Sequence, residues 1–537
     1  MSQEVVKVST RMNNCSFCGA KLVKKYNANA RRLITLNGEF WISERILRCS
    51  NRGCPGHDLS FRAEEFQAAI IPRKIFGLEI ILHIGTLRYE EHKTYEEIRD
   101  ALEKKGIRIS MGELTNLTMT FESLIKGWHE EHIQEIKEKL GKYILSIDGT
   151  YSYRGKTLYI FRSYENGVVL YANTTEKDDV PHLQPLFEKV VEMYGLPMAV
   201  ISDMQPAIIE SVKNVMPGIP HQYCQYHFLK NAGSFMETEY KELGKAMKQK
   251  EVLAKAKGVE ADLKKNAKIE NDKLLLIVHL LVLILKITTD SFPFNLYYVE
   301  LYDRYVRVRR TIRRCIPEYP HEDAYRDALC KLDAILTGVI AEKRVKALVR
   351  ILKRDWRIFK RLRAILENED KGSREVVEGS MRRFLSFLER KAATSKKYAP
   401  LVKQIKKFWC GLFYTYDHDG IPRTNNNMER FIWELRKKWK RMTGCTRVDE
   451  WIAYRAPTGI YMFNLIGTCP PLKELGFSVD VAEMLSSVSY ESYRHCMEEY
   501  DRQKEDDRIR KGGNRDVEAL LKEIERMNKE LSIGSEM

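Results

Sequence analysis

Two apolar stretches, each leading into an aspartate, decide how this chain is expected to fold: Lys142-Tyr-Ile-Leu-Ser-Ile-Asp148 and Leu196-Pro-Met-Ala-Val-Ile-Ser-Asp203. Both stretches are typical of buried β-strands, because each is a short apolar run that contains β-branched residues and ends at a polar residue. A third acid, Glu429, follows the Asn-rich segment Arg423-Thr-Asn-Asn-Asn-Met. A carboxylate at the end of a buried strand costs free energy unless a positive charge neutralises it. Three such carboxylates indicate a divalent-metal site, since Mg²⁺ prefers oxygen ligands and supports phosphoryl transfer.

Strands and helices alternate around the two aspartates. The expected elements are a strand over 143–148, a hairpin of strands 158–163 and 168–173 turning at Glu165-Asn166-Gly167, a helix over 185–194, a strand over 198–203 and a helix over 206–215. This order predicts an α/β layer with a mixed sheet. Residues from about 235 to 415 are expected to be helical throughout, and a helix over about 424–465 is expected to carry Glu429.

Four of the 11 cysteines cluster near the start of the chain, as Cys15-Ser-Phe-Cys18 and Cys49-Ser-Asn-Arg-Gly-Cys54. The residues between the pairs alternate around Asn37-Gly38, which is a hairpin signal. Two cysteine pairs flanking a hairpin resemble a zinc ribbon, in which four thiolates bind Zn²⁺ tetrahedrally. His57 is an alternative ligand to Cys54, although Cys54 closes the more compact loop. The ribbon is expected to contact DNA or protein.

Residues 66–140 are expected to be helical. Thr94-Tyr-Glu-Glu97 and Ser110-Met-Gly-Glu113 are capping boxes, each opening a short helix. The connection over 106–110 has the length typical of a helix-turn-helix, whose second helix can enter the major groove of DNA. An ordinary helical hairpin is the alternative.

The charge balance predicts a polyanionic partner. There are 90 Lys and Arg against 74 Asp and Glu, which gives a net charge of +16, and such an excess attracts nucleic acid. The alternative is a soluble, Lys-rich protein without that role.

Basic residues follow Glu429 and are candidates for binding DNA phosphates: Arg430, Arg436, Lys437, Lys438, Lys440, Arg441 and Arg447. They are interleaved with Trp433 and Trp439, which either stack on an exposed base or belong to the core, and the core role is favoured. A second basic stretch, 344–363, is a candidate track for flanking DNA.

Four motifs occur in a fixed order: Asp148-Gly-Thr, Val200-Ile-Ser-Asp203, Cys224-Gln-Tyr-His227 and Asn426-Asn-Met-Glu429. Together they resemble DDE transposases with an RNase H-like catalytic domain, above all the Mutator-like group and prokaryotic insertion-sequence transposases. The resemblance covers residues from roughly 140 to 460. It implies that the two aspartates and Glu429 are the catalytic ligands of Mg²⁺ or Mn²⁺.

Two points in this motif set stay open. Glu434 is the rival of Glu429, because residues five apart do not share a helix face and only one of the two can reach the metal ions. Cys224 and His227 have ligand-like spacing, but two ligands do not make a zinc site. This pair is expected near the active site, either ordering the entry to the helical insertion or handling DNA.

The resemblance implies an α/β RNase H-like core interrupted by a long all-α insertion and preceded by a zinc ribbon and a helix-turn-helix domain. The expected boundaries are 1–65 for the ribbon, 66–140 for the helix-turn-helix domain, 141–234 and 416–465 for the core, 235–415 for the insertion and 466–537 for a helical tail. Within the tail, residues 516–531 predict an amphipathic helix for docking or self-association.

The implied function is that of an insertion-sequence DNA transposase, which hydrolyses a phosphodiester at each element end and joins the freed 3′ hydroxyl to target DNA. Its expected partners are double-stranded DNA and further copies of the chain, as a homodimer or larger oligomer. A prokaryotic cytoplasm, at the nucleoid, is the expected location. The scattered cysteines fit a reducing compartment, and the apolar run over 274–285 is too short to span a bilayer. The alternatives are a domesticated DNA-binding regulator without catalysis and another nuclease of the same fold, such as a junction resolvase.

Overall fold

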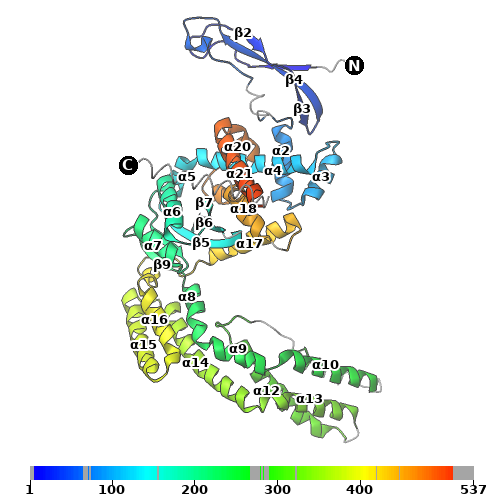
Figure 1. Ribbon diagram of the computed structural model, residues 1–537, viewed down its shortest axis with the longest axis vertical. Helices are drawn as coiled ribbons and strands as arrows, with labels where there is room; N and C mark the ends of the chain where they lie inside the picture. The colour runs from blue at the N-terminus through cyan, green and yellow to red at the C-terminus, as the bar shows by residue number, and fades with distance from the viewer. Residues whose placement is uncertain are drawn as a thin grey trace, which may run out of the picture. The chain divides into compact units, whose positions relative to one another are not determined.

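The computed structural model describes residues 5–63, 71, 74–153, 156–266, 279, 282–283, 290–320, 323–418, 420–446, 448–467 and 469–511. These residues form a mixed α/β structure that is mostly helical and contains two sheets (Figure 1). The chain divides into two units: Met1–Val200, Gln205–Ile219 and Asn426–Met537 form the first, and Ile201–Met204 and Pro220–Asn425 form the second. The tail helix expected over 516–531, most of the apolar run 274–285 and Arg447 lie outside the described residues. Among the described helices, none is long and apolar enough to cross a membrane.

The first sheet is built around one long strand near the N-terminus. Its strands are β1 (Val5–Ser9), β2 (Leu22–Asn27), β3 (Arg31–Thr35) and β4 (Gly38–Cys49), where β4 pairs in parallel with β1 and antiparallel with β2 and β3. The predicted hairpin is present, but its turn lies one residue earlier, because Thr35 pairs with Gly38. The Thr35 hydroxyl accepts a 3.2 Å hydrogen bond from the Asn37 N–H and donates a 3.0 Å bond to the Gly38 carbonyl. This side chain therefore fixes the turn.

The second sheet has the strand order β7-β6-β5-β8-β9. The strands are β5 (Ile144–Tyr153), β6 (Lys156–Ser163), β7 (Val169–Thr175), β8 (Ala199–Ser202) and β9 (His221–Tyr223). β5, β6 and β7 are antiparallel, as the predicted hairpin required. The short strand β9 had no sequence signal.

The expected position of Asp148 at a strand end is wrong. Asp148 pairs with Ile160 in the middle of β5, which continues to Tyr153. Gly149 explains the continuation: a Cβ at this position would lie 2.7 Å from the Tyr159 ring, so the missing side chain lets the cross-strand aromatic pack over the strand. Asp203, in contrast, directly follows β8 as predicted.

The helices of the first unit are α2 (Leu78–Tyr89), α3 (Tyr95–Glu103), α4 (Met111–Glu131), α5 (Ile133–Leu140), α6 (Val180–Tyr194), α7 (Pro206–Val215), α17 (Asn426–Thr443), α18 (Asp449–Gly459), α19 (Pro471–Glu474), α20 (Val481–Ser487) and α21 (Tyr490–Lys511). The prediction for α7 is confirmed. α6 begins before the predicted start, because the Asp179 carboxylate caps it by accepting from the His182 N–H at 3.2 Å. The single helix expected over 424–465 is wrong: Gly444, at φ +66°, separates α17 from α18.

Both predicted helix starts before residue 131 are confirmed, but the second helix is not short. The capping box of α3 is complete, with hydrogen bonds of 3.2 Å and 2.7 Å between Thr94 and Glu97. Ser110 caps α4 by accepting from the Glu113 N–H at 3.1 Å. α4 then runs for 21 residues and is buried throughout 117–129, because α2, α18 and α21 pack around it. The helix-turn-helix role stays a prediction, and the accessible side chains of α4 lie in its first turns and at Glu130 and Glu131.

The second unit is helical, as predicted for its described residues between 235 and 415. Its helices are α8 (Gln225–Ala232), α9 (Glu237–Ala246), α10 (Gln249–Asn266), α12 (Tyr297–Cys315), α13 (Ala324–Ile340), α14 (Lys343–Glu367), α15 (Arg374–Thr394) and α16 (Ala399–Phe408). Figure 1 shows α12 beside α13 and α15 beside α16. Inside this unit, the fully buried Asp355 of α14 is neutralised by Lys397 at 2.7 Å and accepts a 2.8 Å hydrogen bond from the Tyr398 hydroxyl.

The helices of the first unit meet at a buried ion pair. The Glu122 carboxylate of α4 lies 2.6 Å from Nη2 and 3.1 Å from Nε of Arg455 in α18, and both side chains are buried. The hydroxyls of Tyr89 in α2 and Tyr500 in α21 also donate to this carboxylate. Removing two charges from water is costly, so the pair is stable only while all of these hydrogen bonds are made.

We expect Glu122→Ala to lower the free energy of unfolding by about 3–5 kcal/mol, because Arg455 would stay buried without a counter-charge. Denaturant unfolding of the full chain measures the loss. The control is Glu210→Ala on α7, whose carboxylate forms a 3.4 Å exposed pair with Lys213 and should change stability by less than about 1 kcal/mol. Equal losses in the two variants would contradict this account of the ion pair.

Candidate functional site

Four cysteines predicted as metal ligands converge at one end of the N-terminal sheet. Cys49 ends β4, and Cys54 caps the short 3₁₀ helix Pro55–His57. The Sγ–Sγ distances are 3.8 Å between Cys15 and Cys54 and 3.5 Å between Cys18 and Cys49, and all four sulfurs lie within 4.8 Å of one another. Zn–S bonds of about 2.3 Å in a tetrahedron place sulfurs about 3.8 Å apart. The four residues could therefore hold a structural metal ion such as Zn²⁺.

Backbone N–H groups around the cluster favour thiolates. The Asn51 N–H points at the Cys49 sulfur at 3.3 Å, and the Gly56 N–H points at the Cys54 sulfur at 3.4 Å. The Ala20 backbone N–H, with the Cys49 and Cys54 thiols, lowers the pKa of Cys18 to about 7. Burial instead raises the pKa of Cys49 to about 12. Metal binding must therefore displace protons, so affinity should fall as the pH falls.

His57 does not replace Cys54 in this cluster. Its Nδ1 lies 2.8 Å from the Cys49 carbonyl oxygen, which holds the ring against the backbone. The four-sulfur group that could bind a metal contains Cys54. The choice of Cys54 over His57 is thus supported by the structure.

Gly56 makes the close approach to the cluster possible. A Cβ at this position would lie 2.7 Å from the Cys15 sulfur, a separation that packed atoms cannot hold. Gly53 provides a matched comparison four residues after Cys49, because its nearest neighbour would be Asn51 Oδ1 at 3.6 Å, an ordinary contact.

We expect Gly56→Ala to lower Zn²⁺ affinity by about tenfold or more, since the new methyl group must push a ligating sulfur aside. Gly53→Ala should leave the affinity unchanged. Competition with a chromophoric chelator on the full chain measures both. Equal affinities in the two variants would contradict the role given to Gly56, and retention of zinc after Cys49→Ser would show that these cysteines do not form the site.

The three predicted catalytic acids occupy the sheet and the start of a helix. Asp148 lies in β5 and Glu429 in the first turn of α17, both within the first unit, whereas Asp203 belongs to the second unit. Next to Asp203, the Ser202 hydroxyl lies 2.8 Å from Nε2 of His221. Burial lowers the pKa of His221 to about 3, so this ring is neutral at physiological pH. Convergence of the three carboxylates on metal ions stays a prediction.

The structure gives a reason to prefer Glu429 over Glu434. The Glu434 carboxylate accepts a 3.1 Å hydrogen bond from Nε of Arg430, whose side chain is exposed to solvent. Arg162 of β6 is half-buried, with its guanidinium 3.9 Å from the centre of the Phe431 ring. Burial lowers the pKa of Arg162 to about 10, and the nearby charge of Glu434 opposes that shift. Glu434 is thus paired with Arg430 and lies near the positive charge of Arg162.

Cys224 and His227 lie at the start of α8 in the second unit. Cys224 is buried and is the residue before the helix, and its sulfur accepts a 3.3 Å hydrogen bond from the Asn425 N–H. The Gln225 N–H donates to the Arg423 carbonyl at 2.9 Å. The Asn-rich segment is therefore anchored at Cys224, where the helical insertion begins. The role of the Cys224 and His227 pair stays a prediction.

The basic residues of α17 do not form one uniform surface. Arg430, Lys437 and Lys440 are exposed, while Arg436 pairs with Asp449 at 3.0 Å and Arg441 pairs with Glu97 at 2.7 Å. Lys438 is half-buried, with its ammonium 5.1 Å from the centre of the Phe463 ring. These six are the described members of the predicted DNA-binding set, and all of them except Lys438 are exposed. Arg430 also pairs with Glu434 at 3.1 Å. Lys437 and Lys440 form no ion pair with another described residue, so they are the best placed to bind phosphates.

The expectation that both tryptophans belong to the core is correct for Trp439 and wrong for Trp433. Trp439 is buried, whereas 60% of Trp433 is exposed. The helical period explains the difference, because Trp433 shares a face with Arg430 and Lys437, opposite the buried Phe431 and Leu435.

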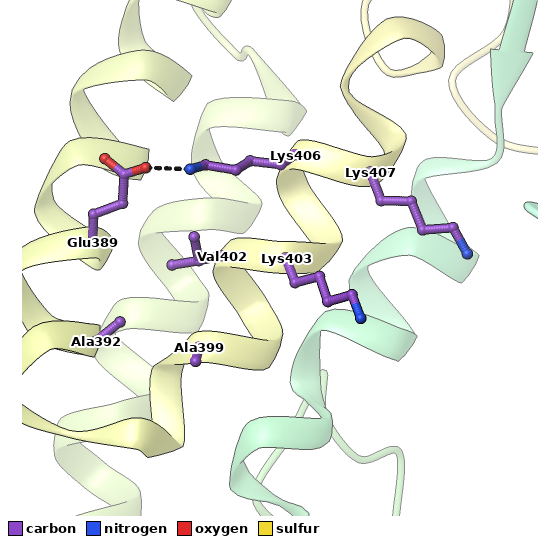
Figure 2. Close-up of a pocket in the computed structure, with 7 residues that line it drawn as sticks. All are labelled: Glu389, Ala392, Ala399, Val402, Lys403, Lys406 and Lys407. Atoms are coloured by element: carbon purple, nitrogen blue, oxygen red, sulfur yellow. Dashed lines mark ion pairs between the residues drawn. The ribbon is translucent and has the colours of Figure 1, made fainter.

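Two further basic surfaces lie in the second unit. On α14, exposed side chains recur along one face, at Lys346, Arg350, Arg357, Lys360 and Arg361. An open pocket of about 600 Å³ lies between α15 and α16, where Lys406 pairs with Glu389 at 2.7 Å. Figure 2 shows that Lys403 and Lys407 point away from that acid. The α14 stretch was identified from the sequence, but the α16 lysines were missed. The helical period would have placed these lysines on the face opposite the buried Leu401 and Ile405.

The sequence matches no model of a known protein family, and no curated protein matches it either.

Proposed function

We propose that this chain is a DNA transposase with an RNase H-like catalytic core. The supporting observation is the sheet, in which three antiparallel strands are followed by alternating helices and strands in the order β7-β6-β5-β8-β9. Asp148 lies in the central strand β5, Asp203 follows β8, and Glu429 opens α17.

The proposed reaction is a pair of phosphodiester exchanges on DNA. Asp148, Asp203 and Glu429 supply carboxylate oxygens, the ligands that Mg²⁺ or Mn²⁺ prefers. Two such ions, when bound, activate the attacking oxygen and stabilise the leaving one. Water attacks the phosphorus at an element end and the 3′ oxygen leaves as a hydroxyl. That hydroxyl then attacks a phosphodiester of target DNA, which releases a 3′ hydroxyl of the target strand.

The charge distribution supports DNA as the substrate. The net charge is +16, and exposed lysine and arginine side chains lie on α17, α14 and α16. Exposed lysines and arginines bind phosphates without reading sequence. In this proposal, the N-terminal sheet that carries the four cysteines and the first turns of α4 recognise the element ends. Two ends must be handled together, so the active form is a homodimer or larger oligomer.

We expect Asp148→Asn and Asp203→Asn each to lower Mg²⁺-dependent cleavage by at least about 100-fold, because a metal ion contributes several kcal/mol to the transition state. DNA binding should be unchanged. The measurement uses the full chain and a labelled duplex that carries the DNA flanking its own gene. Asp100→Asn, on the exposed face of α3, is the control.

Cleavage or strand transfer retained in either active-site variant would overturn the assignment of the acids. Binding without cleavage in the unmodified chain as well would favour a DNA-binding regulator with this fold. Cleavage without any joining of donor to target DNA would favour a nuclease.

A further inference from the structure

Trp433 is an exposed aromatic residue in an unusual setting. Single exposed apolar side chains are common and need no explanation, but this indole lies in a row of cations. Lys437, one turn on, places its ammonium 5.3 Å from the centre of the indole ring. Arg430, one turn back, has 80% of its side chain exposed. Lys440 continues the same face and is exposed.

The composition of this face indicates which kind of partner it fits. A protein–protein contact would surround the indole with other apolar side chains, because the centres of such interfaces are depleted in charge. Here Lys437 and Lys440 are exposed cations, and the adjacent acid Glu434 is paired with Arg430 at 3.1 Å. The buried apolar residues of α17 point to the opposite face. An aromatic ring flanked by cations is the pattern that binds single-stranded nucleic acid, where the ring stacks on a base and the cations bind phosphates.

The base that Trp433 takes must be unstacked. In an intact duplex both faces of each base are covered by its neighbours, so a side chain on a helix surface cannot stack on it. Trp433 lies four residues after Glu429, which is about 6 Å along the helix axis. A base that meets this indole therefore belongs to a nucleotide close to the proposed reaction centre.

We propose that Trp433 stacks on an unpaired or flipped base of DNA beside the cleaved phosphodiester, while Lys437 and Lys440 bind the flanking phosphates. This inference rests on the proposed function and makes its substrate more specific, because it requires a locally opened duplex. Trp433 is then a positioning residue, which holds the opened strand and does not act on the reacting atoms.

The test compares two duplexes of the same sequence, one fully paired and one with an unpaired 2-aminopurine at the cleavage position. Binding of the full chain is measured without divalent metal ions by fluorescence anisotropy. We expect the unmodified protein to bind the opened duplex about tenfold more tightly. Trp433→Ala should abolish that preference and the quenching of 2-aminopurine, whereas Trp433→Phe should retain most of both.

Two control variants separate the stacking of Trp433 from the effect of a nearby positive charge and from the effect of removing any exposed aromatic side chain. Lys440→Ala should weaken binding to both duplexes equally, so the ratio of the two affinities stays the same. The slope of log affinity against log salt concentration should fall in magnitude by about 1, because one phosphate contact is lost. Tyr490→Ala removes another exposed aromatic residue, 40% accessible, and should leave the ratio unchanged. Unfolding curves of Trp433→Ala should match those of the unmodified chain, because the side chain is exposed.

The outcomes distinguish this inference from the proposed function. Equal affinity of the unmodified protein for both duplexes, or a preference that survives in Trp433→Ala, would overturn the stacking role and leave the DNA function standing. A change of oligomeric state in Trp433→Ala with an unchanged preference would also overturn it and would assign the indole to self-association. Failure of the unmodified protein to bind either duplex would overturn both proposals.

Discussion

The ion pair between Glu122 and Arg455 joins segments 333 residues apart in the chain, and the helices of the first unit depend on it. Arg455 belongs to α18, which follows α17 after a short connection at Gly444. Beyond α18, the Asn464 side chain accepts a 2.7 Å hydrogen bond from the Val169 N–H and donates a 3.0 Å bond to its carbonyl. The segment that carries Glu429 and Trp433 is thus fixed both to the buried helix α4 and to strand β7.

Two kinds of candidate metal ligand are separated along the chain. The N-terminal sheet has few buried apolar side chains, and three of the four clustered cysteines are among them. A metal ion bound there would replace the core that such a small sheet lacks. The carboxylates at β5, β8 and α17 have the opposite character, since hard oxygen ligands suit exchangeable cations that act in phosphoryl transfer. Sulfur ligands therefore fit a structural role, and oxygen ligands fit the proposed reaction.

Local signals predicted the elements whose cause is local. The capping box at Thr94 and the first-turn proline of α7 act within a few residues, and both predictions match the structure. The four cysteines also converge as predicted, because each pair has a short spacing and a hairpin joins the two pairs. The failures have distant causes. α4 is long and buried because α18 and α21 pack on it, and Asp148 lies within β5 because Tyr159 of the next strand packs over Gly149. The exposure of Trp433 follows from the helical period, which was available in the sequence but was not used.

We propose that Asp148, Asp203 and Glu429 share a divalent-metal site, and Mn²⁺ binding is the measurement that tests this proposal. Electron paramagnetic resonance of the zinc-loaded full chain counts bound Mn²⁺ in the unmodified protein and in the matched variants Glu429→Gln and Glu434→Gln. We expect Glu429→Gln to lose bound Mn²⁺ and Glu434→Gln to retain it, because Glu434 is already paired with Arg430. Loss in Glu434→Gln alone would move the third ligand to that residue, and unchanged binding in both variants would contradict the shared site.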